Sequence, residues 1–413
     1  MLADLRSTRY PVEVGLLLAF CLFLPLVEMP KNLAWLLYVV AWFVNRVRAG
    51  ELGRRLLQTW DRWDTLFALW IGTGYLVSFF AGIQGTEIGG AHELARYALL
   101  GWLVKRAGYG PRETRWVLGM LLASAVAGLA FGYWRIATGA AKSGTLQLHS
   151  VGHVNHTAIY LAILLGVATS WLFAAWPSWT RGVRAIGLSL VLLLLVSLVA
   201  TASRGAVGVG LVLLLVLAAA WWPRWRMPLA ASGVTVLVAV AAVLLTGAEL
   251  VQKHVKFAGQ NNALSSRDGI WRMALAAWEH YPWFGVGMDN YSRITPERVQ
   301  AWRAQAGKDY DPARYVQHAH AHNLFVNALA ERGLVGFAVL AAVLAAWLAR
   351  LWGQRPAPSD DDVAWLAWGA AASAWVVTVG VGMVNTTLHH EHGLLAALLL
   401  GLWLSRPTTR PAS

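Results

Sequence analysis

Long apolar runs without charged residues recur along the whole 413-residue chain and restrict it to folds that span a membrane. A helix needs about 20 residues to cross a hydrocarbon core about 30 Å thick. The runs are continuously apolar, whereas the strands of a membrane barrel alternate between apolar and polar residues. The sequence therefore predicts one all-α polytopic membrane domain over residues 1–413. Its twelve expected spans are 12–28, 32–47, 65–82, 94–108, 115–134, 157–176, 184–201, 205–222, 228–246, 323–350, 364–385 and 391–405.

Lys and Arg are distributed unevenly among the connections between these spans. With spans of alternating direction, nineteen fall on one side of the membrane and five in the short connections on the other. Cytoplasmic connections carry the excess, so we assign the first side and both termini to the cytoplasm. Residues 247–321, between the ninth and tenth spans, then form a long outer loop. Because this topology explains the net charge of +13, we expect no nucleic-acid partner. The tail 407–413 is expected to be disordered.

The histidines all lie on the predicted outer side or at its margin. Ionisable groups at a membrane are costly and are functional candidates by default, although several of these could simply be interfacial hydrogen-bonding residues. We assign no role to three of them, His153, His156 and His392. The twelve histidines are His92, His149, His153, His156, His254, His280, His318, His320, His322, His389, His390 and His392.

Three polar motifs each begin a predicted helix on the outer side. TASRG at 201–205 begins the eighth span, with Ser203 as a candidate N-cap, and HN at 322–323 begins the tenth. SSRD at 265–268, which contains Ser266, begins a helix within the loop. Helix N-termini attract anions such as phosphate through their free N–H groups and positive dipole end.

Two of these motifs also contain an arginine, Arg204 and Arg267. A guanidinium group binds phosphate oxygens in pairs, so the sequence predicts an anion-binding clamp just outside the membrane. Each residue has a structural alternative. Arg204 could be a membrane-flanking side chain, Arg267 a solvated loop charge, and His322 a helix cap.

Taken together, the spans, the long loop and these motifs resemble the O-antigen ligase/polymerase superfamily. The resemblance rests on Ser203-Arg204-Gly205, on Ser265-Ser266-Arg267 followed by Trp271, and on the stretch from His322-Asn323 to Glu331-Arg332-Gly333 and Gly336. It implies a GT-C-like glycosyltransferase of the bacterial inner membrane with a periplasmic active site. The donor would be a glycan on undecaprenyl pyrophosphate and, in ligases, the acceptor a lipid A–core sugar, with membrane lipids as further partners.

The resemblance also implies that His322 is the essential histidine and that Arg204 and Arg267 are the family's two arginines. The chemistry agrees, because transfer needs a base for the acceptor hydroxyl and positive charge for the departing pyrophosphate. A single displacement would invert the anomeric configuration. The possible supporting residues are His320, Asn323, Ser203, Ser266, His389 and His390. His320 could itself be the base, but the following Asn323 favours His322.

Two metal-binding alternatives were considered, and we expect neither a metal nor a cofactor. Asp309-Tyr310-Asp311 has the Asp-x-Asp form of cation-dependent glycosyltransferases but lies in a loop segment. His318, His320 and His322 could form a zinc site, yet no Cys or outer carboxylate accompanies them. The arginines make a metal unnecessary for charge.

Within the loop, residues 266–280 have an apolar stripe at helical spacing, which predicts a helix along the bilayer surface. A Pro- and Gly-containing break at 281–287 and a second helix near 295–306 follow. The loop is expected to cover the cavity between spans.

Three alternatives to a ligase remain. An O-antigen polymerase or a protein O-oligosaccharyltransferase would share the carrier and the Arg/His set. The compact size and single loop favour a ligase. A lipid or anion transporter would have broken helices and ionisable groups on both sides; here these groups gather on one face.

Overall fold

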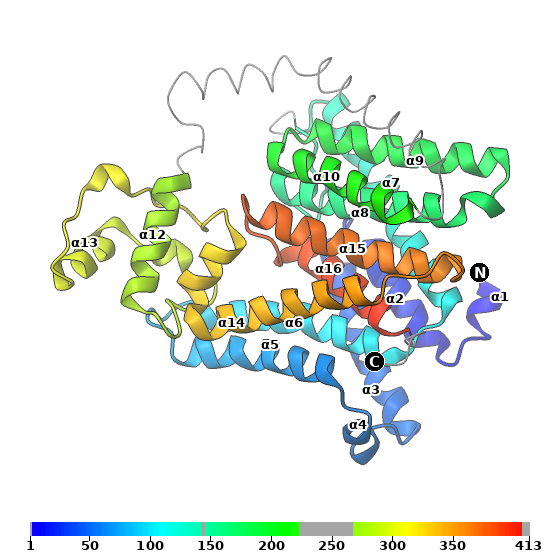
Figure 1. The fold of residues 1–413 in the computed structure, drawn as a ribbon, viewed down its shortest axis with the longest axis horizontal. Helices are drawn as coiled ribbons and strands as arrows, with labels where there is room; N and C mark the ends of the chain where they lie inside the picture. Colours follow the sequence, from blue (N-terminus) through cyan, green and yellow to red (C-terminus); the bar gives the residue numbers. More distant parts are fainter. Residues whose placement is uncertain (1, 142–144, 223–266, 407–413) are drawn as a thin grey trace.

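A computed structural model describes residues 2–141, 145–222 and 267–406, in which all regular secondary structure is helical. The long helices lie side by side, and a smaller helical unit containing α12 and α13 lies at one end of them (Figure 1). The α-helices are α1 (Leu2–Leu5), α2 (Pro11–Phe23), α3 (Glu28–Arg48), α4 (Arg54–Gln58), α5 (Arg62–Phe79), α6 (Glu87–Ala107), α7 (Pro111–Ala137), α8 (Val154–Ala175), α9 (Arg181–Ala200), α10 (Arg204–Trp221), α12 (Arg267–His280), α13 (Pro296–Gln305), α14 (Leu324–Gly353), α15 (Asp362–Gly382) and α16 (His390–Leu404).

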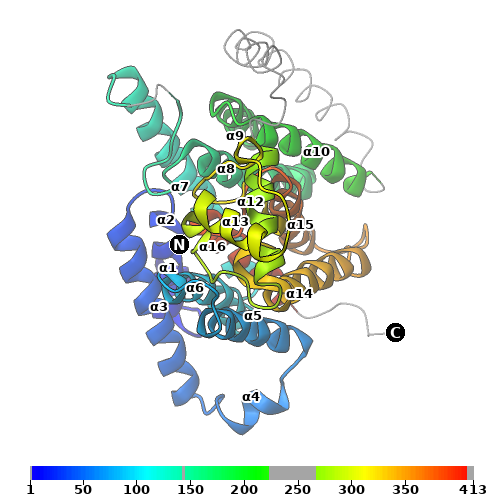
Figure 2. The ribbon, with the colours of Figure 1, turned by 90° about the vertical axis from the view of Figure 1, so that its left-hand side faces the viewer.

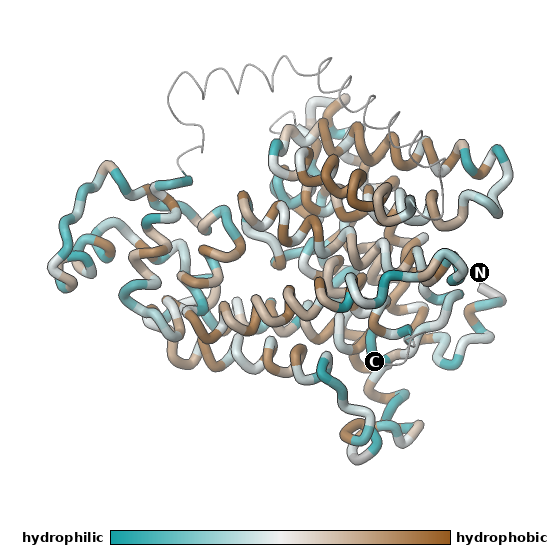
Figure 3. The backbone as a smooth tube through the Cα atoms, viewed as in Figure 1, coloured by the Kyte–Doolittle hydropathy of each residue, from teal (hydrophilic) through white to brown (hydrophobic). Residues whose placement is uncertain are grey.

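Eleven of the twelve expected spans fall on described residues, and each of the eleven is a helix. The remaining expected span, the ninth at 228–246, lies outside the described residues. Hydrophobic residues follow the helices, and hydrophilic ones concentrate at their ends (Figure 3). The all-helical, multi-pass class is confirmed, whereas the exact number of spans stays a prediction. Within the described residues, six helical stretches are long and apolar enough to cross a membrane: Pro111–Ala137, Val154–Ser178, Arg181–Ala200, Arg204–Trp221, Leu324–Gly353 and Asp362–Gly382.

The centre of the bundle is formed by α8, α15 and α16, which are buried along most of their length. Two small-residue pairs explain how closely α8 and α15 pack. A Cβ added at Gly166 would lie 2.2 Å from Ser373 Oγ, and one at Gly369 would lie 2.3 Å from Ser170 Oγ. Small residues of this kind let membrane helices approach closely.

The two ends of the bundle differ in their polar residues. At the end that we call the histidine end, helices α8, α10, α14 and α16 begin, and α12 and α13 lie in front of it when the bundle is viewed from this side (Figure 2). The opposite end, the Asp64 end, contains the beginning of α5 and the end of α6.

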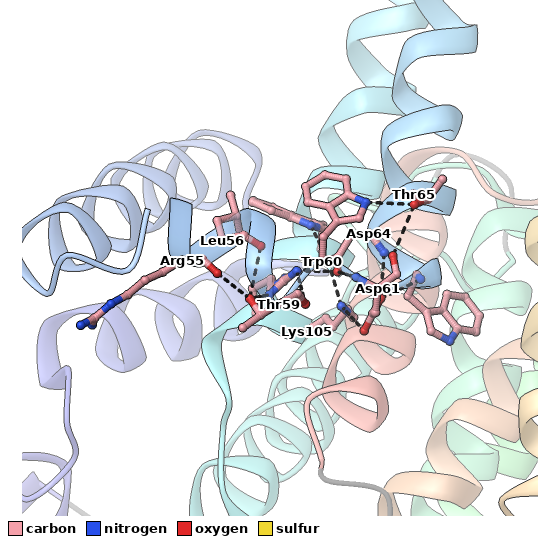
Figure 4. A network of polar contacts seen from close by, with 11 residues as sticks. Arg55, Leu56, Thr59, Trp60, Asp61, Asp64, Thr65 and Lys105 are labelled. Carbon is pink, nitrogen blue, oxygen red and sulfur yellow. Dashed lines mark hydrogen bonds and ion pairs between the residues drawn. The ribbon is translucent and has the colours of Figure 1, made fainter. Parts of the chain in front are cut away.

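Buried charges also occur at the Asp64 end, so the expectation that ionisable groups gather on one face is wrong. The buried Asp64 carboxylate accepts hydrogen bonds from Trp102 Nε1 at 2.9 Å, Lys105 Nζ at 2.8 Å and Arg106 Nε at 2.8 Å (Figure 4). Each of these carboxylate bonds joins α5 to α6. The charges are paired with one another and therefore fix helices, rather than outlining a path through the bundle.

Helix α14, expected as one continuous span, is broken at Gly333, whose φ of 57° and ψ of −164° are not helical. The loop 282–287 lies against this break. A Cβ at Gly333 would lie 2.3 Å from the carbonyl carbon of Trp283, so only glycine fits. The break leaves two helix carbonyls without helical partners, and the loop supplies their donors instead. Val286 N donates to Ala330 O at 2.8 Å, and Gly287 N donates to Glu331 O at 3.0 Å.

The apolar stripe of α12 faces protein, not the bilayer surface that the sequence predicted. Ile270, Met273, Ala274 and Ala277 are buried in a second, smaller core. Most of its other members come from α13, from the loops before α13 and α14 and from the first turns of α14, among them Trp302 and Ala330; Ile83 joins from the connection between α5 and α6. The predicted helices at 266–280 and 295–306 are present as α12 and α13, and they form a compact unit at the histidine end.

Candidate functional site at the histidine end

Three helix starts at the histidine end share one unusual backbone turn. Ala202, His322 and Leu388 each lie two residues before the first residue of α10, α14 and α16, and their φ angles are 56°, 49° and 59°. Left-handed backbone is uncommon for residues other than glycine and costs about 1–3 kcal/mol where it is strained. Among the described residues the other two cases, Asp289 and His390, lie at the same end. Such conformations concentrate at functional sites.

The orientation of the His322 imidazole is set by Asn385, just beyond the end of α15. His322 Nδ1 lies 3.2 Å from Asn385 Oδ1, and that oxygen also accepts from the Thr386 backbone N–H at 2.9 Å. Because the backbone N–H can only donate, the Asn385 atom is an acceptor and His322 Nδ1 must carry the proton. His322 Nε2 then has a free lone pair, and it lies 3.4 Å from His318 Nε2.

The backbone before His322 is held from both sides by α12 and α14. Trp271 Nε1 donates to the carbonyl of Ala321 at 3.0 Å, and Ala321 N–H donates to Asn327 Oδ1 at 3.0 Å. Asn327 in turn donates through Nδ2 to Glu331 Oε2 at 2.9 Å. Trp271 and Arg267 both lie on α12, and Trp271 joins this helix directly to Ala321, the residue before His322. The spacing between Arg267 and Trp271 therefore has a structural reason.

Asn323, not His322, caps α14. Its Oδ1 accepts from Phe325 N at 2.9 Å and Val326 N at 3.1 Å, and its Nδ2 donates to the Met383 carbonyl at 2.9 Å. The cap thus also joins α14 to the end of α15. This leaves the ring of His322 available for chemistry, and the alternative of His322 as a helix cap is wrong.

The two predicted supporting serines, of which Ser203 was the candidate N-cap, have different outcomes. Ser203 occupies the N-cap position of α10 but makes no side-chain capping bond; its N–H instead donates to Thr201 Oγ1 at 3.3 Å. Ser266 lies outside the described residues.

Arg204 and Arg267 are the first residues of α10 and α12. A Cβ at Gly205 would lie 2.6 Å from Val384 Cγ2, so the start of α10 lies against the segment that contains Asn385. Burial lowers the pKa of Arg267, and the charge of Arg204 lowers it further. The two guanidinium groups are therefore close enough to repel each other, an arrangement suited to a dianionic group between them.

The pKa of His322 is lowered mainly by burial, an effect that the Asn385 hydrogen bond opposes. The charges of His318 and Arg267 lower this pKa further. The structure thus brings His322, Arg267 and Arg204 into one electrostatic neighbourhood. A lowered pKa keeps His322 neutral, the form in which it can accept a proton.

His322 belongs to a continuous group of imidazoles. Ring centroids of His320 and His322 are 4.3 Å apart, and those of His318 and His322 are 4.4 Å apart. His320 lies 6.2 Å from His389. Burial, and after it the neighbouring imidazoles, lower the pKa of His320 to about 3, so this ring is neutral, with one nitrogen that donates a hydrogen bond and one that accepts.

A polar cavity of about 200 Å³ adjoins this group, between α6, α14 and the start of α16. The predicted supporting residues His320, His389 and His390 line it. The acidic and basic side chains of the wall, which the sequence did not assign to the site, are Glu93, Asp289, Glu331 and Arg332.

Sequence reasoning missed Asn385 and Glu93 altogether. Asn385 lies in the short polar run between the last two spans, and that run was the available signal. Glu93 forms no recognisable motif in the sequence. It lies on the first turns of α6, lines the cavity and accepts from the His390 backbone N–H at 2.9 Å.

Two histidine trios could hold a metal ion among the described residues. In each trio one nitrogen of every ring lies within 4.8 Å of the others. One trio is His318, His320 and His322, and the other is His156, His389 and His392. The Asp-x-Asp segment is different: Asp311 Oδ1 accepts from the Ala313 N–H at 3.0 Å and caps a 3-10 turn at Pro312–Arg314.

The fold and this site define a multi-pass membrane protein with a polar, histidine-rich site at one end of its helices. Residues 188–341 match a family described as O-antigen ligase, which supports the chain as a member of the O-antigen ligase superfamily. The match runs from α9 into α14 and includes Arg204, Arg267 and His322. It indicates a glycosyltransferase-like enzyme of O-antigen biosynthesis with ligase or polymerase-type activity. No curated protein matches the chain.

Proposed function

We propose that the protein is an O-antigen ligase that transfers a glycan from undecaprenyl pyrophosphate to a sugar hydroxyl of lipid A–core. The observation that carries the proposal is the unprotonated Nε2 of His322, in a tautomer set by Asn385 and in the field of Arg267. A base beside fixed positive charge meets the two needs of glycosyl transfer from a pyrophosphate. The neighbouring cavity, which His320 lines, is polar, as a carbohydrate acceptor requires.

In the proposed reaction, the acceptor oxygen attacks the anomeric carbon while His322 Nε2 takes the hydroxyl proton. The bond between the anomeric carbon and the pyrophosphate oxygen breaks, and its electron pair leaves with undecaprenyl pyrophosphate. Arg204 and Arg267 stabilise the charge that develops on this leaving group. One displacement inverts the anomeric centre. The two guanidinium groups supply the positive charge, so no metal ion takes part in the transfer.

We further propose that the histidine end faces the periplasm and that both termini are cytoplasmic, in the bacterial inner membrane. The distribution of Lys and Arg among the connections supports this orientation. Cysteine scanning tests it, because Cys21 is the only native cysteine and is buried. An impermeant maleimide should label a cysteine at exposed Ala319 in intact spheroplasts and fail to label one at exposed Ser359; the reverse pattern contradicts the orientation.

The transfer assay combines the purified chain, a glycan linked to undecaprenyl pyrophosphate and lipid A–core, with electrophoresis of the products. A glycan-capped lipid A–core is the expected product. Lengthening of the carrier-linked glycan without capping would favour a polymerase, and no change in either lipid would contradict both.

The residue assignment is tested by His322→Ala, for which we expect a loss of at least about 100-fold in rate. His92→Ala is the matched control, since His92 is an exposed histidine at the same end that bonds the Ile88 carbonyl in its own helix. Equal rates for the two variants would exclude His322 as the base.

A further inference from the structure

A second histidine cluster lies beside the proposed base and takes no part in the proposed transfer. We call His156, His389 and His392 the α8–α16 trio, because His156 is in the first turn of α8 and the other two begin α16. The ring centroids are 4.8 Å apart for His156 and His389, 5.4 Å for His156 and His392, and 4.9 Å for His389 and His392. The three rings thus form a compact triangle.

One member of the trio has a polar atom without a partner. His392 is 1% exposed, and its Nε2 has no hydrogen-bond partner. A buried polar atom left unsatisfied costs about 1–3 kcal/mol. Imidazole nitrogen is also the commonest metal ligand among side chains. A bound cation would satisfy this atom.

His389 already has the orientation that metal ligands usually have. Its Nε2 lies 3.1 Å from the Thr386 carbonyl, to which only an N–H can donate, so Nδ1 carries the free lone pair. A backbone carbonyl that accepts from the second ring nitrogen is the usual outer partner of a metal-bound histidine. The ring is therefore prepared for a ligand at Nδ1.

The nearby carboxylates are occupied elsewhere. Glu391 pairs with the buried ammonium of Lys31, and Glu93 pairs with His390. The α8–α16 trio thus offers three imidazole nitrogens and no carboxylate. Such donors suit zinc and neighbouring transition metals more than calcium or magnesium, which prefer oxygen.

We propose that His156, His389 and His392 bind one divalent transition-metal ion of the zinc class. The ion would join the start of α8 to the start of α16. Bonds of about 2.0–2.1 Å to each nitrogen require the rings to move inward slightly from the observed spacing. Three protein ligands leave a fourth position open, and His389 also lines the polar cavity. The proposal is independent of the proposed transfer reaction.

The other trio is a weaker site for an ion. His318, His320 and His322 lie on a loop, and His318 is exposed. The experiment therefore has to distinguish the two trios. It also has to be free of the substrates, so that its result does not depend on the transfer activity.

The test is a cobalt titration of the full chain in detergent, stripped of metal and without a polyhistidine tag. We expect one Co²⁺ per chain, with the strong visible absorption of a four-coordinate site, and displacement by Zn²⁺. His392→Gln and His156→Gln should each weaken cobalt binding by more than about 10-fold. His318→Gln, the matched control, should leave it unchanged.

Folding of each variant is checked by size-exclusion elution and circular dichroism, and the more accessible His156 provides a second variant should His392→Gln misfold. Zn²⁺ should also raise the thermal unfolding midpoint of the native chain, because it binds the folded state. Absence of stoichiometric cobalt binding to the native chain would overturn the proposal. So would binding that survives both glutamine substitutions, or that is lost only in His318→Gln.

Discussion

Replacement of Gly333 by alanine tests whether the break in α14 holds the site together. An alanine at a φ of 57° and ψ of −164° costs about 1–3 kcal/mol in backbone strain alone. Its Cβ would also lie 2.3 Å from the carbonyl carbon and oxygen of Trp283. These are backbone atoms that cannot rotate away, so the loop 282–287 must separate from the helix.

Four backbone hydrogen bonds join the loop to the break, and each contributes about 0.5–1.5 kcal/mol. Together with the strain, their loss makes local opening more favourable by at least about 3 kcal/mol, which corresponds to an increase of about 100-fold in amide exchange. The bonds are Val286 N to Ala330 O at 2.8 Å, Gly287 N to Glu331 O at 3.0 Å, Leu334 N to Pro282 O at 2.8 Å and Val335 N to Trp283 O at 3.1 Å.

The assay is hydrogen–deuterium exchange measured by mass spectrometry on peptides that cover the loop and the break. Gly89→Ala is the matched control, because Gly89 is a helical residue of α6 with open space around its Cβ position. We expect that control to leave exchange in the loop unchanged. If Gly333→Ala also leaves it unchanged, the strain and the four bonds do not determine the stability of this junction, and the reasoning fails.

The remaining predictions concern the base, its pH dependence, the clamp and the opposite end of the bundle. Asn385→Ala should lower the transfer rate by about 10- to 100-fold, because the tautomer of His322 is no longer fixed; an unchanged rate would exclude this positioning role. Since the pKa of His322 is lowered and its neutral form is the base, kcat/KM should stay level as pH falls to 6.5 and decline only below it. A decline that begins above pH 6.5 would contradict this assignment. Arg267→Lys keeps the positive charge but loses the paired hydrogen bonds that a guanidinium group makes to phosphate, so we expect the transfer rate to fall by about tenfold. An unchanged rate would contradict the proposed clamp. Asp64→Asn removes the carboxylate that pairs with Arg106 and leaves Lys105 with Asp61 alone, so it should destabilise the fold by about 3 kcal/mol in denaturant titration, while activity per folded molecule is retained.

The helices could be predicted from the sequence because a continuously apolar run of about 20 residues in a membrane can satisfy its backbone hydrogen bonds internally only as a helix. The motif positions also led to His322 and to both arginines, and the structure brings these residues near one another. The break at Gly333 was not predicted, because its cause is the loop 282–287, about fifty residues earlier in the chain. An apolar run gives no sign of a distant backbone that approaches it.

Asn385 and Glu93 illustrate a second limit. Each is a polar residue near the end of an apolar run, where polar residues are ordinary. Their roles depend on which helices are neighbours, and the pattern of a single span contains no information about its neighbours. The apolar stripe of α12 was misassigned for the same reason: its period reveals an apolar face, but the partner of that face is α13 and α14, not lipid.

The two arginines of the proposed clamp begin helices that pack in different hydrophobic cores. Arg204 begins α10, which is part of the main core, whereas Arg267 begins α12, which belongs to the smaller one. A pyrophosphate held by both would act as a bridge between two cores that otherwise meet along the first turns of α14, where Leu324 and Ala328 belong to the main core and Ala330 to the smaller one. Donor affinity then includes the equilibrium for docking one core on the other, and it falls in proportion to the docked fraction. Substitutions far from either arginine that loosen this docking would weaken donor binding while leaving every phosphate contact in place.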